Sequence, residues 1–191
     1  MITQLFDLPI LDWIAQNLHH PWMDAVMTTI THMGDSGALW IILAAVLLAF
    51  PQHRKAGMTM LLALLIGLVV CNLTLKPLVA RMRPYDYQFL HFGKEIPLLI
   101  PAPTDFSFPS GHTNASFAAA TALLLCNRKL GIPAILAAML IAFSRLYLYV
   151  HYPTDVLAAV VLGSAAGFAA NILASRVLPC LLKRIQMKYK E

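Results

Sequence analysis

The chain has 191 residues, of which 59% are hydrophobic and only 12% are charged, and its mean hydropathy is +0.70. This composition excludes an ordinary water-soluble domain and is typical of apolar helices in a membrane. The net charge of +5 does not indicate a nucleic-acid partner, because the basic residues gather in short loops and in the tail. We expect an all-α fold, an integral membrane helical bundle that forms one domain over residues 1–191.

The N-terminal segment, residues 1–35, is predicted to lie at the membrane surface. Within it, residues 5–18 mix apolar and polar positions around Trp13, which is too polar for a span and favours an interfacial helix. The segment lacks the basic start of a cleavable signal peptide. Residues 1–53 contain no Lys or Arg but several Asp, which favours a location outside the cytoplasm.

Five apolar segments follow, and each predicts a transmembrane helix. The charge-free segment 56–75 has the length of about 20 residues that crosses the hydrocarbon core of a bilayer. Shorter segments can cross when their polar flanks reach the interface. Gly163 and Gly167 predict a close approach between the last helix and a neighbour. The expected spans are 37–50, 56–75, 110–127, 130–150 and 155–178.

The distribution of Lys and Arg predicts the orientation. Basic residues at 53–55, at 128–129 and in the tail 183–190 fall on one side of five spans, and the positive-inside rule makes this side cytoplasmic. The C-terminus is then cytoplasmic in the plasma (inner) membrane. Other basic residues remain on the outer side, where binding an anion would explain them: Lys76, Arg81, Arg83, Lys94 and Arg145.

Two polar clusters at the ends of predicted spans suit such an anion. Lys76 and Arg83 form a cation pair for phosphoryl oxygens, although a lone Lys at a helix end often only reaches back to the interface. The next span opens with a Pro-Ser-Gly-His sequence. Ser110 is a favoured N-cap, Gly111 lets a ligand approach the backbone, and the free N–H groups of a helix start bind anions. Capping alone explains Ser110 but not His112.

A third cluster joins the last two spans and contains Arg145, His151 and Asp155. Pro153 suits the first turn of a helix, which would bring the carboxylate to one ring nitrogen of His151 and orient the other toward a substrate. A purely structural His–Asp pair is the alternative. Metal ligation is disfavoured because no Cys or third carboxylate converges with the pair, so neither a metal nor a cofactor is expected.

Together the clusters resemble the signature of the type 2 phosphatidic acid phosphatase superfamily, across residues 76–155. Lys-x6-Arg-Pro, Pro-Ser-Gly-His and Ser-Arg-x5-His-x3-Asp are all present, in order and without substitution. The apolar helices match the integral-membrane branch rather than the soluble vanadium haloperoxidases. The resemblance implies that His151 is the nucleophile, that Asp155 holds it, and that His112 is the general acid and then the base. It also implies a phosphate site without metal, formed by Lys76, Arg83, Ser110, Gly111 and Arg145.

Two features lie outside this signature. Arg81 is expected to anchor the chain at the interface, and binding a second phosphate or a lipid head group is the alternative. The loop 85–108 carries prolines and aromatic residues, and we expect it to cover the site and to influence selectivity.

An outer-side site that is reached from the bilayer suits a lipid phosphate as the substrate and membrane partner. Similarity to short bacterial members of the superfamily favours hydrolysis of undecaprenyl diphosphate to undecaprenyl phosphate. Phosphatidylglycerophosphate and phosphatidate are alternative substrates, and a lipid phosphotransferase is an alternative activity. A non-enzymatic transport or lipid-binding protein would not require the ordered His112, His151 and Asp155. The oligomeric state is left open.

Overall fold

The structure is a computed structural model that describes residues 3–188, with side chains described as far as residue 176. The described residues form helices and no strand, so the predicted all-α class is confirmed. The basic tail 183–190 lies outside the described side chains. The helices are α1 (Leu8–Asn17), α2 (Pro21–Met33), α3 (Ala38–Ala49), α4 (Arg54–Gly67), α5 (Lys76–Val79), α6 (Pro84–Phe92), α7 (Gly111–Cys126), α8 (Arg128–Tyr147) and α9 (Pro153–Lys188), with helical turns η1 (Thr3–Asp7), η2 (Asp35–Gly37), η3 (Pro51–His53) and η4 (Leu68–Leu75).

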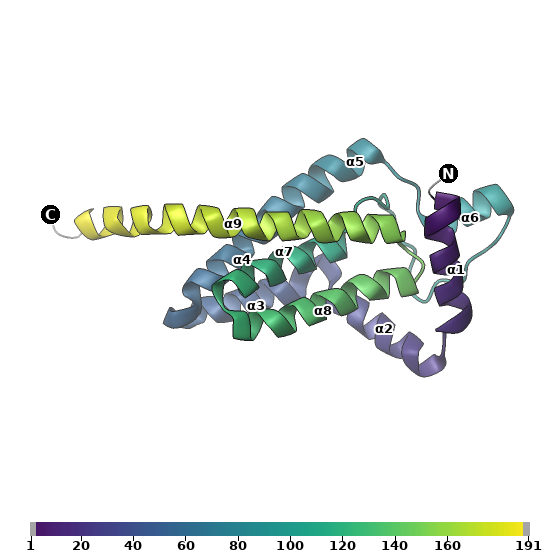
Figure 1. Cartoon of the computed structure of the whole chain (residues 1–191), viewed down its shortest axis with the longest axis horizontal. Helices are drawn as coiled ribbons and strands as arrows, with labels where there is room; N and C mark the ends of the chain where they lie inside the picture. The colour runs from purple at the N-terminus through teal and green to yellow at the C-terminus, as the bar shows by residue number, and fades with distance from the viewer. Residues whose placement is uncertain (1–2, 189–191) are drawn as a thin grey trace.

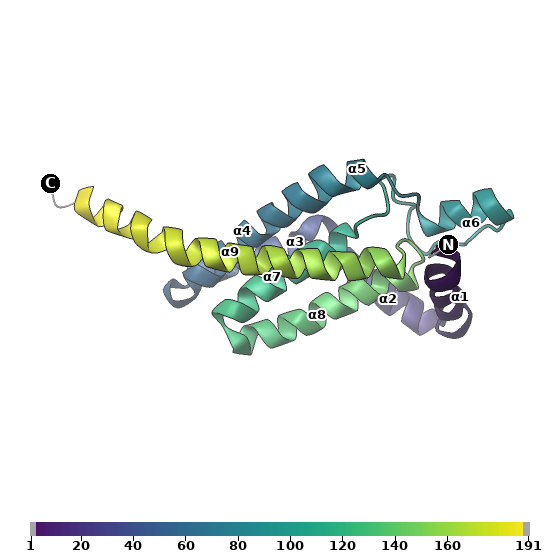
Figure 2. The same ribbon diagram turned by 45° about the horizontal axis from the view of Figure 1, so that its top comes forward.

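The long helices run side by side along one axis, and α7 lies among them (Figures 1 and 2). α7 packs against α4, α8 and α9, and almost all of its residues from Thr113 to Leu123 are buried. Most of these residues are Ala, Ser or Thr, whose small side chains let neighbouring helices come close. The core is therefore built around α7.

Three stretches are long and apolar enough to cross a membrane: Pro51–Phe92, Arg128–Tyr147 and Pro153–Arg176. α2 and α3 meet the same criterion together, as a pair bent by 46°. The remaining predicted span corresponds to α7, which has only 16 residues and is enclosed by the others. The count of five crossings therefore stays a prediction. Large apolar side chains face outward all along the bundle, as lipid contact requires, and include Ile42, Leu136, Val161 and Phe168.

The N-terminal residues 1–35 divide into two helices with different surroundings. α1 lies across one end of the bundle in both views, burying Leu8, Leu11 and Ile14 and exposing Trp13 (Figures 1 and 2). α2 instead belongs to the bundle and continues into α3 through the bend at residues 34–37. The surface-lying part is therefore shorter than the 1–35 expected from the sequence.

The predicted close approach of Gly163 and Gly167 is confirmed, and α7 is the neighbour. A Cβ atom at Gly163 would lie 2.5 Å from the carbonyl oxygen of Asn114, and one at Gly167 would lie 2.8 Å from that of Ala118. Neither distance is possible for real atoms, so both positions require glycine. This contact fixes α9 against α7, and each of these helices carries part of the predicted site near its N-terminus.

The two ends of the bundle differ in character. The turns between α3 and α4 and between α7 and α8, which carry predicted cytoplasmic basic residues, lie at the end opposite α1 and α6 (Figure 1). The start of α7, the end of α8 and the start of α9 all lie toward the end where α1 and α6 are found. The three polar clusters are thereby brought to one end.

Candidate active site

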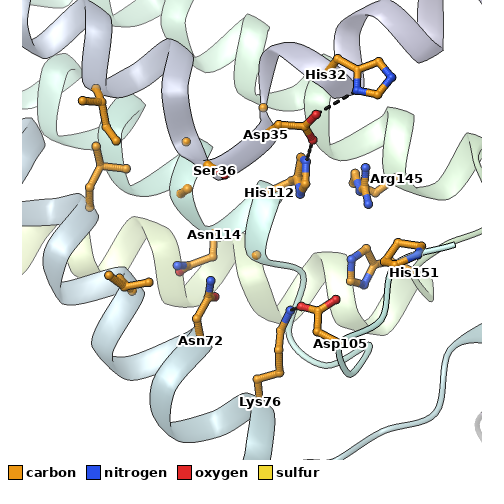
Figure 3. Close-up of a pocket in the computed structure, with 18 of the residues that line it drawn as sticks. His32, Asp35, Ser36, Asn72, Lys76, Asp105, His112, Asn114, Arg145 and His151 are labelled. Atoms are coloured by element: carbon orange, nitrogen blue, oxygen red, sulfur yellow. Dashed lines mark hydrogen bonds and ion pairs between the residues drawn. The ribbon is translucent and has the colours of Figure 1, made fainter. Parts of the chain in front are cut away.

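One cavity of about 840 Å³ collects the predicted residues at this end of the bundle (Figure 3). Six of the eight line it, from five separate parts of the chain: Lys76, Arg83, Gly111, His112, Arg145 and His151. The other two, Ser110 and Asp155, are fully buried outside its lining. Segments that are distant in the sequence thus form one polar site, as the motifs predict.

The three predicted phosphate-binding cations are almost completely buried. Lys76, Arg83 and Arg145 are only 7%, 3% and 3% exposed. Arg83 donates a 2.7 Å hydrogen bond to the carbonyl of Val150, and Arg145 donates one of 2.5 Å to the hydroxyl of Thr31. Buried charges are costly unless they are paired, so this concentration of cations indicates an anion site.

Asp105 lies between two of these cations and was missed by the sequence analysis. Its carboxylate forms ion pairs with Lys76 and, at 2.5 Å, with Arg83. Burial opposes ionisation, but the contacts with Lys76 and Arg83 outweigh it and lower the pKa of Asp105 to about 2. The carboxylate is therefore charged at neutral pH and binds the same cations that a phosphate would use.

His151 lies between α8 and α9, with its ring in the wall of the cavity. Its Nδ1 atom is 3.6 Å from Asp155 Oδ2, which is too long for a hydrogen bond, and its Nε2 atom is 3.4 Å from Arg83 Nη1. Burial, together with the charges of Arg83 and Arg145, lowers the pKa of His151 to about 3 despite the neighbouring Asp155. The imidazole is therefore neutral at physiological pH, as a nucleophile must be.

Asp155 is held by groups that the sequence motifs do not include. It accepts a 2.5 Å hydrogen bond from Arg81 Nη1, one from the hydroxyl of Ser107, and one of 3.0 Å from the backbone N–H of Tyr152. Arg81 is 2.7 Å from Asp7 through its other terminal nitrogen and does not line the cavity. Arg81 is therefore engaged by two buried carboxylates rather than by the cavity.

His112 lies at the start of α7 and faces the same cavity as His151. Its Nε2 atom is 2.8 Å from Asp35 Oδ1, and the other oxygen of Asp35 is 2.8 Å from His32 Nδ1 (Figure 3). Ser110 occupies the N-cap position of α7, as predicted, but its hydroxyl contacts Thr113 rather than a backbone N–H. The helix start is thus available to an anion through the backbone at Gly111.

The cavity also has an apolar part that extends away from the cations. Ile41 of α3, Leu61, Leu64 and Leu65 of α4, and Leu68 of η4 line it. A polar end with cations and histidines that continues into an apolar channel matches a ligand with a charged head and a hydrocarbon tail.

The predicted loop 85–108 contains more structure than expected, because its first residues form α6. Its later part, with Ile100, Pro101, Pro103 and Asp105, lines the cavity and so covers the site. Among the described residues, no three His, Cys, Asp or Glu side chains are grouped closely enough to hold a metal ion.

Sequence reasoning missed the carboxylates at Asp7, Asp35 and Asp105 and the hydroxyl of Ser107. Their signal is weak, because acidic residues in a surface segment or a loop are common. Asp105 and Ser107 do lie four and two residues before Pro109, which opens the Pro-Ser-Gly-His sequence, and this proximity was the available indication.

The family model described as the PAP2 superfamily matches residues 56–178. An undecaprenyl-diphosphatase from Sulfolobus acidocaldarius is 38% identical over 131 residues, which are 68% of this chain but only 61% of that protein, less than two thirds of its length. The undecaprenyl-diphosphatase BcrC of Bacillus subtilis is 34% identical over 154 residues, covering 78% of this chain and 74% of that protein. These relatives are phosphatases acting on a lipid diphosphate by name, as the motifs led us to expect.

Among solved structures, LpxE of Aquifex aeolicus has a TM-score of 0.73 and 26% sequence identity. The alignment covers 89% of this chain and 98% of that one, so the similarity extends over nearly the whole bundle. The family match covers well over half of the chain and includes all three motifs. The chain therefore belongs to the PAP2 superfamily.

Proposed function

We propose that this protein is a metal-independent membrane phosphatase that hydrolyses a lipid diphosphate or monophosphate, with undecaprenyl diphosphate as the favoured substrate. The supporting observation is the single cavity in which buried cations and two imidazoles adjoin an apolar channel. The names of the relatives from Sulfolobus acidocaldarius and Bacillus subtilis favour the isoprenoid diphosphate.

The first step is phosphoryl transfer to His151. Nε2 of the neutral ring attacks phosphorus, and the bond from phosphorus to the leaving oxygen breaks. His112 donates a proton to that oxygen, so the lipid leaves as the neutral or singly protonated product. Asp155, 3.6 Å from Nδ1, stabilises the positive charge that His151 acquires.

The second step is hydrolysis of the phosphohistidine. His112, now neutral, accepts a proton from water as the water oxygen bonds to phosphorus and the bond to Nε2 breaks. Inorganic phosphate leaves, and both imidazoles return to their starting states. A general acid or base contributes only about 10²–10⁴-fold, so stabilisation of the equatorial oxygens must supply much of the remaining acceleration. That Lys76, Arg83 and Arg145 all line the cavity supports this role for them.

The active site is proposed to face the outer side of the plasma membrane, with the C-terminus in the cytoplasm. The separation of the polar clusters from the α3–α4 and α7–α8 turns supports this orientation (Figure 1). The substrate would enter from the bilayer, with its phosphate at the level of the lipid head groups.

The direct test is phosphate release by the detergent-purified protein from undecaprenyl diphosphate, phosphatidylglycerophosphate and phosphatidate. We expect the highest kcat/KM with undecaprenyl diphosphate and a loss of roughly 10⁴-fold or more in His151→Ala. Arg54→Gln, at the start of α4, is the control and should retain activity. Near wild-type turnover by folded His151→Ala would refute the nucleophile assignment.

Trapping the intermediate separates the two steps. A lipid diphosphate has a good leaving group, so His112→Ala should still phosphorylate itself and then accumulate a base-stable, acid-labile phosphohistidine. His112→Ala combined with His151→Ala should not be labelled. Release of inorganic phosphate in water alone supports a hydrolase, whereas turnover that depends on an added lipid acceptor would favour the phosphotransferase.

A further inference from the structure

The bend between α2 and α3 places a carboxylate against the proposed proton donor. Both oxygens of Asp35 are bonded to imidazoles, Oδ1 to His112 Nε2 and Oδ2 to His32 Nδ1, each at 2.8 Å (Figure 3). All three side chains line the cavity. The family signature includes only His112 of the three.

The backbone of the bend is shaped for this contact. A Cβ atom at Gly34 would lie 2.9 Å from His112 Cδ2, so any larger residue there would displace the imidazole. Ser36 has a φ of 53° and Gly37 one of 68°, and the first of these is unfavourable for a residue other than glycine. Such backbone strain persists where surrounding structure requires it, often at functional sites.

The positive charges around His112 explain why a carboxylate beside it would be needed. Arg145 and Lys76 line the same cavity, and their positive charges disfavour a protonated imidazole beside them. His112 must nevertheless be protonated at the start of each cycle to serve as the general acid. Asp35 is the carboxylate in hydrogen-bond contact with it among the described residues.

We infer that Asp35 is the positioning residue for His112, and that His32 fixes the carboxylate in place. Accepting a hydrogen bond from Nε2 holds one tautomer, leaves Nδ1 to exchange the proton with the substrate, and stabilises the imidazolium. The side chains of His32 and Asp35 are each 54% exposed, so this pair also connects His112 to solvent. The inference rests on the proposed function, because it assigns a partner to the general acid of that reaction.

The test uses leaving groups of different acidity, because a poor leaving group needs the proton from His112 and a good one does not. The purified full-length protein is assayed on a long-chain alkyl phosphate and on a nitrophenyl phosphate. The ratio kcat/KM is measured because it covers the steps up to departure of the leaving group. In Asp35→Asn we expect it to fall roughly 10- to 100-fold for the alkyl ester, less than the loss of a whole general acid, and less than about threefold for the aryl ester.

Three variants accompany Asp35→Asn. His32→Gln should give a smaller loss of the same selective kind, and Gly34→Ala should reproduce the selective loss by displacing the His112 ring. Asp86→Asn, on the exposed surface of α6, should leave kcat/KM unchanged for both substrates. Thermal unfolding of each variant shows whether it is folded.

The outcomes are distinct. A selective loss with the alkyl ester supports the inference. Equal losses on both substrates, or no loss on either in folded Asp35→Asn and Gly34→Ala, overturn it while leaving the proposed function intact. If the wild type hydrolyses neither ester and no lipid phosphate, the proposed function is wrong, and this inference is wrong with it.

Discussion

At the scale of single residues, neighbouring arginines in one motif have separate roles. Arg83 lines the cavity, whereas Arg81 bridges the buried carboxylates of Asp7 and Asp155 and lies 3.8 Å over the ring of Tyr152. Arg81 thereby links the N-terminal segment to the carboxylate beside the nucleophile.

Replacement of Arg81 tests this link. Arg81→Gln leaves two buried carboxylates without their cation, which is strongly destabilising when a pair is broken on one side only. We expect a lower melting temperature and a kcat reduced roughly 10-fold or more, because Asp155 loses its alignment with His151. The inhibition constant of inorganic phosphate should change little, since Arg81 is outside the cavity. A large change in that constant with kcat preserved would instead make Arg81 a phosphate ligand.

At the scale of helices, the sequence predicted most elements but not how their ends are shaped. Uninterrupted apolar composition located α4, α8 and α9, and the N-cap position of Ser110 located the start of α7. The α2–α3 bend was not predictable, because the conformation of Ser36 is not one that serine favours locally. It depends on packing of Gly34 against His112 and Ile141, which are distant in the sequence.

The same distinction applies to the site. The signature residues were predictable because three polar clusters stand at the ends of apolar segments and match, in order, the three motifs of a known signature. Asp35, Asp105 and Asp7 were not, because each becomes part of the site only through contacts across the fold. The His151–Asp155 pair was expected to be hydrogen-bonded, and the structure instead places Nδ1 and Oδ2 3.6 Å apart, with that oxygen accepting from the Ser107 hydroxyl and the Tyr152 backbone N–H.

The α7–α9 contact provides a prediction for a helix pair. Gly163→Val places side-chain atoms where the backbone of α7 already lies, 2.5 Å from the Cβ position, so the helices must separate. We expect a loss of roughly 1–3 kcal/mol in stability and reduced activity, because α7 carries His112 and α9 carries Asp155. Val161→Leu, on the exposed side of α9 at 67% exposure, should change neither property. The midpoint of unfolding in detergent is measured for both variants, and equal midpoints would contradict this packing.

At the scale of the whole molecule, the bundle has a chemically distinct end. The cavity and its covering loop lie toward the end with α1 and α6, and the basic turns of the positive-inside pattern lie at the other (Figure 1). We expect a site at this end of the spans to lie at head-group depth, where a lipid presents its phosphate.

Cysteine accessibility tests the orientation in intact cells. In a background without Cys71, Cys126 and Cys180, Glu95→Cys should react with a membrane-impermeant maleimide applied from outside, whereas Lys129→Cys should react only after the membrane is opened. Both native residues are exposed in the structure, so burial does not explain a difference between them. Labelling of Lys129→Cys from outside, with Glu95→Cys protected, would place the site in the cytoplasm.

The carboxylate of Asp105 lies between Lys76 and Arg83, so it would compete with a phosphate for these two cations. Because it is part of the chain, it cannot diffuse away. A tethered group of this kind acts at an effective concentration of about the millimolar range, whatever the surrounding solution contains. We therefore expect dilute anions in water to displace Asp105 poorly, and phosphates that are concentrated in the plane of a bilayer to displace it. The loop would then select phosphates by where they reside, before any bond is made or broken.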